Sequence, residues 1–80
     1  MSDLNTNVAM NIVGNLGFSI SNNTKQELIA LVKEKLIELQ DYENNQKAVL
    51  IATSINEYLS SDKFKQEMLN SLIATIKNYL

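Results

Sequence analysis

The sequence predicts an all-α protein, a small antiparallel four-helix bundle made by one domain over residues 1–80. Proline is absent and glycine occurs only at positions 14 and 17, so long segments lack residues that break helices. Apolar residues make up 45% of the chain and recur at spacings of three and four. The last twenty residues show this most clearly, and their apolar stripe is wide enough to pack against at least two other helices.

The first helix is predicted at about 4–16. Ser2, Asp3 and Asn5 are its candidate N-caps, and Gly17 is expected to end it as the C′ residue. Gly14 lies inside this segment, where glycine costs up to about 1 kcal/mol relative to alanine. We expect Gly14 to allow close packing against a neighbouring helix, and a hinge is the alternative. The apolar face of this helix comprises Val8, Ala9, Ile12, Val13 and Leu16.

The second helix is predicted at about 24–41, after a short extended segment that turns Phe18 and Ile20 inward. Thr24 and Glu27 have the spacing of a capping box, which places the start of the helix at Thr24. Its predicted core face comprises Leu28, Ile29, Val32, Leu36 and Leu39, with Leu31 at the edge.

The third and fourth helices are predicted at about 45–59 and 61–80. The joint at residues 41–45 contains neither glycine nor proline, so helices two and three could also continue as one rod, which would bury its face only by dimerising. The third helix carries Ala48, Ile51, Ala52, Ile55, Tyr58 and Leu59 on its core stripe, and the fourth carries Phe64, Met68, Leu69, Leu72, Ile73, Ile76, Tyr79 and Leu80.

Three apolar residues, Ile37, Val49 and Leu50, lie off these stripes. We expect the N-terminal segment to bury them, and the alternative is an exposed apolar patch. Tyr42 differs from the other aromatic residues because it lies in the polar joint. It either packs locally over the joint or contacts a partner.

Composition argues against an enzyme. Cysteine, histidine and arginine are absent, which removes thiol and histidine nucleophiles, cysteine or histidine zinc sites and bidentate phosphate binding. We therefore expect no catalytic residues, no cofactor and no metal. The net charge of −2 and the scattered lysines disfavour nucleic acid as the partner. No apolar run reaches membrane-spanning length and no signal peptide is recognisable, so we expect a cytoplasmic protein.

Four acidic residues of the second helix, Glu27, Glu34, Glu38 and Asp41, recur at helical spacings and form an acidic stripe. A solvated surface is the simpler interpretation of this stripe. The alternative is a docking strip for a basic partner.

The segments TKQELIALVKEKLIELQ and QKAVLIATSINEYLSSDKFKQEMLNSLIATIKNYL resemble the immunity proteins that protect producers of class IIa, pediocin-like bacteriocins, especially the enterocin A immunity type. The shared features are a helix with a leucine-rich face, a polar joint, a "VL…INEYL" helix and a closing amphipathic helix. The resemblance extends from about Val8 to the end of the sequence.

This resemblance implies a cytoplasmic four-helix bundle that acts on a protein partner, the bacteriocin-bound membrane subunits of the mannose phosphotransferase system. It also implies that specificity resides in the C-terminal half, which comprises the third and fourth helices and their junction at residues 58–64. The partner-binding residues that we predict are Tyr42, Tyr58, Ser60, Ser61, Lys63, Phe64 and Lys77.

Two other functions are consistent with the same sequence. One is a phage- or plasmid-encoded regulatory adaptor that inhibits a host protein by docking a helix face. The other is a structural homodimer sealed by exposed apolar residues.

Overall fold

The structure is a computed structural model that describes residues 3–17, 19–59 and 66–80. These residues form four α-helices: α1 (Leu4–Gly14), α2 (Asn22–Glu38), α3 (Asn44–Leu59) and α4 (Gln66–Lys77). The predicted fold class, a small antiparallel four-helix bundle, is confirmed. Some residues to which the sequence assigned roles lie outside the described residues: Ser2, Phe18, Ser60, Ser61, Lys63 and Phe64.

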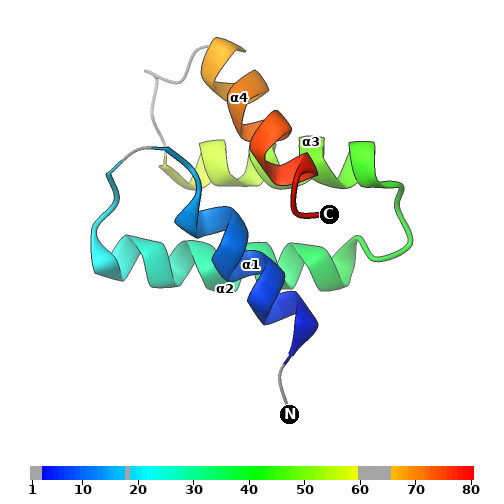
Figure 1. The fold of residues 1–80 in the computed structure, drawn as a ribbon, viewed down its shortest axis with the longest axis horizontal. Coiled ribbons are helices and arrows are strands. Elements are labelled where there is room, and N and C mark those ends of the chain that lie inside the picture. The colour runs from blue at the N-terminus through cyan, green and yellow to red at the C-terminus, as the bar shows by residue number, and fades with distance from the viewer. Residues whose placement is uncertain (1–2, 18, 60–65) are drawn as a thin grey trace.

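The helices lie in two layers. α2 and α3 run side by side in opposite directions, and α1 and α4 cross them obliquely on one face (Figure 1). α1 packs against α2, α2 against α3, and α3 against α4. The shortest dimension of the molecule is 18 Å, which matches two layers whose helix axes are about 8–10 Å apart.

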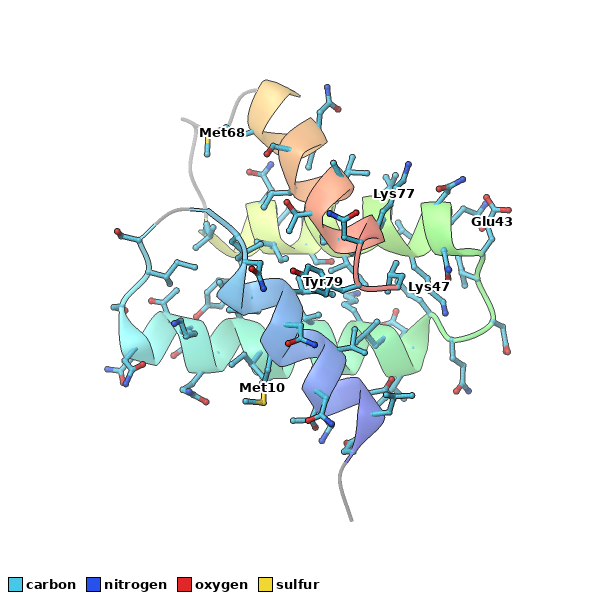
Figure 2. The ribbon with its side chains drawn as sticks, viewed as in Figure 1. Met10, Glu43, Lys47, Met68, Lys77 and Tyr79 are labelled. Atoms are coloured by element: carbon cyan, nitrogen blue, oxygen red, sulfur yellow. The ribbon has the colours of Figure 1, made fainter. Side chains whose placement is uncertain are left out.

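The core lies between the layers and is apolar throughout. The described part of the chain has no buried polar or charged residue. All four predicted helix faces contribute to it: its buried members are Ala9, Ile12, Val13, Leu16, Leu28, Val32, Leu36, Leu39, Ala48, Ile51, Ala52, Ile55, Leu72 and Ile76. After α4 the chain turns back, and Tyr79 packs against this core in the middle of the molecule (Figure 2).

The start of α2 differs from the prediction. Ser21 is the N-cap, because its hydroxyl oxygen accepts a hydrogen bond from the Thr24 backbone N–H at 3.2 Å. The helix therefore begins at Asn22, two residues before the predicted capping box, and Thr24 lies within the first turn. Serine competes well for this position since its short side chain reaches the N–H groups of the first turn.

The helix ends also differ. The rod formed by helices two and three does not exist, because α2 ends at Glu38 and a turn separates it from α3. Asp41, assigned to the second helix, lies in this turn. α1 ends at Gly14, with Asn15 as its C-cap, so Gly17 is not the C′ residue. Gly14 also has open space where a Cβ would lie, so the predicted close packing at this position is wrong.

Asp3 joins α1 to α2. Its carboxylate accepts a hydrogen bond from the Asn5 backbone N–H at 3.0 Å, as an N-cap does, and forms an ion pair with Lys33 Nζ at 2.8 Å. The hydrogen bond from Lys33 holds the pKa of Asp3 below its ordinary value; desolvation opposes it, and hydrogen bonds from Thr6 and Asn5 aid it. Asp3 was one of the three predicted N-caps.

The lowered pKa predicts how stability depends on pH. A carboxyl with a lower pKa in the folded state stabilises the fold above its unfolded pKa, near 3.9, and loses that effect as the pH falls through the folded pKa. Asp3→Asn keeps an N-cap but removes the charge. We expect the wild type to melt at a higher temperature than Asp3→Asn at pH 7, and this difference in melting temperature to shrink as the pH falls below the ordinary pKa of aspartate, about 3.9. An equal difference in melting temperature at neutral and at acidic pH would contradict a charge effect.

Candidate functional site

The candidate site is a surface groove where the α2–α3 turn meets the first half of α3. It is lined by Tyr42, Asn45, Gln46, Val49 and Leu50 and has a volume of about 350 Å³. We call it the α3 groove. Ligand pockets in proteins span roughly 300–1,000 Å³, so this groove has room for one or two side chains of a partner.

Three of the five lining residues are large and apolar or aromatic, and all three are exposed. Tyr42 is 48% exposed, Val49 43% and Leu50 40%. The predicted burial of Val49 and Leu50 is therefore wrong. The reason is geometric: α3 turns Ala48, Ile51, Ala52 and Ile55 toward the core, and this leaves the opposite side of the helix uncovered.

Ile37 is also exposed, at 49%, so its predicted burial is wrong as well. It belongs to α2 and does not line the α3 groove. Of the three apolar residues that lie off the helix stripes, only Val49 and Leu50 line the α3 groove, together with Tyr42.

The next turn of α3 is also uncharged. The Thr53 hydroxyl donates a hydrogen bond to the Val49 carbonyl oxygen at 2.8 Å, and the Ser54 hydroxyl donates to that of Leu50 at 3.0 Å. Both hydroxyl protons are therefore used within the helix. No residue from Ala48 to Asn56 carries a charge, so the exposed side of α3 is uncharged over more than two turns.

Two exposed carboxylates flank the groove residue Tyr42 in the sequence. Asp41 and Glu43 are the covalent neighbours of Tyr42, about 3.8 Å away along the chain between Cα atoms, and both are exposed. Within the described residues, neither forms an ion pair, whereas Glu38 binds Lys35 at 3.3 Å. Glu43 extends away from the bundle at the start of α3 (Figure 2). Glu27, Glu34 and Glu38 of the predicted acidic stripe are exposed on α2.

The predicted partner-binding residues do not converge on one place. Tyr42 precedes α3, whereas Tyr58 lies near its other end, about 20 Å away at 1.5 Å per residue. Tyr58 is 39% exposed, although the sequence placed it on the core stripe. Lys77 is exposed at the end of α4, toward the same end of the bundle as Glu43 (Figure 2). Of the predicted residues that are described, only Tyr42 lines the α3 groove.

Two further features were not predicted. A smaller hollow of about 180 Å³ lies between the end of α1 and α4, lined by Leu16, Gly17, Met68, Ser71 and Leu72. Its two sides come from helices far apart in the sequence, so no local pattern could indicate it. The Asn56 side-chain oxygen is buried and has no hydrogen-bond partner in the described part of the chain.

Comparisons with protein-family models, with curated proteins and with solved structures found no match to this chain. Among the residues that the structure describes, no helix combines the length and the apolar character needed to cross a bilayer.

Proposed function

We propose that this chain is a bacteriocin immunity protein, a non-enzymatic cytoplasmic binder that protects the cell from a pediocin-like bacteriocin at its membrane receptor. Two lines of support are independent of each other. The sequence of α2, α3 and α4 resembles the enterocin A immunity type, and the fold leaves an apolar groove open on α3.

The α3 groove is the observation that carries the proposal. Exposed large apolar residues that gather in a hollow are typical of binding surfaces, whereas scattered ones are ordinary. Tyr42 gives the groove an aromatic anchor with a polar tip, a residue type enriched at protein interfaces. The groove also lies at the start of the C-terminal half, to which the resemblance assigns specificity.

A protection assay tests the proposed function. The chain is expressed in a strain sensitive to pediocin-like bacteriocins, and the killing dose is measured for a panel of these toxins. We expect strong protection against one or two of them. Lack of protection against the whole panel, with folded protein confirmed in the cells, would overturn the proposal in favour of a regulatory adaptor.

Two substitutions place the activity on the groove. Leu50→Lys puts a charge among the groove residues, and we expect it to raise sensitivity to the toxin at least tenfold. Met10→Lys is the matched control, because Met10 is 52% exposed on α1 and points away from α3 and α4 (Figure 2). Full protection by Leu50→Lys would show that binding uses another surface.

A structural homodimer is the second candidate, favoured by the exposure of Ile37 and Leu50. It predicts twice the mass of one chain at micromolar concentration in sedimentation or light scattering. Since Ile37 lies outside the groove, the two residues can be tested separately. Dissociation by Leu50→Lys alone would place the dimer on α3, and dissociation by Ile37→Lys alone would place it on α2.

A further inference from the structure

We propose that the α3 groove binds a cationic amphipathic helix of the partner protein, with apolar side chains in the groove and lysine or arginine side chains at Asp41 and Glu43. This inference deepens the proposed function and rests on it for the identity of the site. It assigns the partner's chemistry, which the resemblance does not give.

The α3 groove and the surface beyond it suit a row of apolar side chains. The groove holds one or two side chains, and the uncharged side of α3 extends beyond it through Thr53 and Ser54, whose hydroxyl protons are already used. A helix that presents apolar residues at spacings of three and four matches such a strip, because those residues lie along one side of it. Asn45 and Gln46 add amide groups to the groove wall that can pair with polar groups of the partner.

The turn before α3 carries exposed negative charge. Asp41 and Glu43 are exposed on both sides of Tyr42 and form no ion pair within the described residues. The cation nearest along α3, Lys47, is half-buried and lies one helical turn after Glu43. Two exposed carboxylates therefore outnumber one half-buried ammonium around Tyr42, and a partner with positive charges there gains complementary contacts.

The same charges separate this partner from a second copy of the chain. A twofold interface joins a surface patch to the same patch on a second copy. A dimer formed through the α3 groove would therefore place Asp41 and Glu43 of both protomers in one interface. Like charges at an interface disfavour that pairing. A cationic helix has no such conflict.

The experiment uses three labelled helical peptides of about 15 residues. The first has leucines at spacings of three and four with lysines elsewhere, the second has the same composition in scrambled order, and the third has glutamates in place of the lysines. Binding to the full chain is measured by fluorescence anisotropy at about 0.05 M and about 0.3 M salt. We expect the first peptide to bind at least tenfold more tightly than the others and more weakly at high salt.

Single substitutions identify the contacts. We expect Asp41→Asn and Glu43→Gln each to weaken binding about two- to fivefold at low salt, and Leu50→Ser to weaken it about tenfold or more. Glu27→Gln is the matched control, since it removes one charge from the far end of α2, and we expect it to leave the affinity unchanged. Circular dichroism confirms that each variant is folded.

Several results would overturn the proposal. These are equal binding of the lysine and glutamate peptides, equal affinity of Glu43→Gln and the wild type, or a stable dimer that buries Leu50 and excludes the peptide. The protection assay separates the two proposals. If Leu50→Lys abolishes protection but the wild type binds the lysine and glutamate peptides equally, only the cationic partner is refuted. If the wild type binds the lysine peptide but gives no protection, only the immunity function is refuted.

Discussion

Ile51→Ala is expected to destabilise the protein by about 2–5 kcal/mol, the usual cost of truncating a fully buried aliphatic side chain. Ile51 has no exposed surface and lies in the core on α3, which packs against both α2 and α4. Removing its outer carbons loses their transfer free energy and leaves a cavity that the neighbouring helices fill only in part. A domain of 80 residues has a total stability of about 4–12 kcal/mol, so this single change removes a large share of it.

The measurement is urea or thermal unfolding followed by circular dichroism, and the melting temperature should fall by at least about 8 °C. Leu50→Ala is the matched control, because it changes the adjacent residue of the same helix, which is 40% exposed. We expect that control to stay within about 0.5 kcal/mol of the wild type. Equal losses of stability in the two variants would mean that α3 does not turn its Ile51 side toward the core.

The helix faces could be predicted because burial repeats with the period of the helix. Ile12, Leu28 and Ile51 each belong to a run with spacings of three and four, and each is fully buried in the structure. Helix ends were less predictable, since several residues compete to cap one helix. At the start of α2, both Ser21 and Thr24, the latter paired with Glu27 in a capping box, are residue types suited to the N-cap. Only the backbone path into the helix selects Ser21.

The α3 groove could be predicted only in part. The sequence indicated that Tyr42 lies in a polar joint and that Val49 and Leu50 lie off the core stripe of their helix. Whether another segment covers such residues depends on how α1 and α4 cross the α2–α3 pair, and no local pattern encodes that crossing. Burial was therefore expected where the tertiary arrangement leaves α3 exposed.

The two glycines should respond to alanine in opposite ways. Gly17 has a φ of +84°, in the left-handed region, where an L side chain costs about 1–2 kcal/mol. Gly14 is the last residue of α1 and has open space around an added Cβ, so Gly14→Ala gains up to about 1 kcal/mol of helix propensity. We expect Gly17→Ala to lower the melting temperature, by up to about 10 °C, and Gly14→Ala to raise it.

This pair isolates the backbone because other contributions are shared. Each substitution removes a similar amount of conformational entropy from the unfolded chain, which by itself stabilises a protein by about 0.4–1 kcal/mol. Neither added methyl group meets another atom within 4 Å, so steric contacts with neighbours do not enter. The difference between the two melting temperatures therefore reports the conformation at Gly17. If both variants were more stable than the wild type, residue 17 would have to leave the left-handed conformation without a cost in free energy. The turn after α1 would then not be a fixed part of the fold.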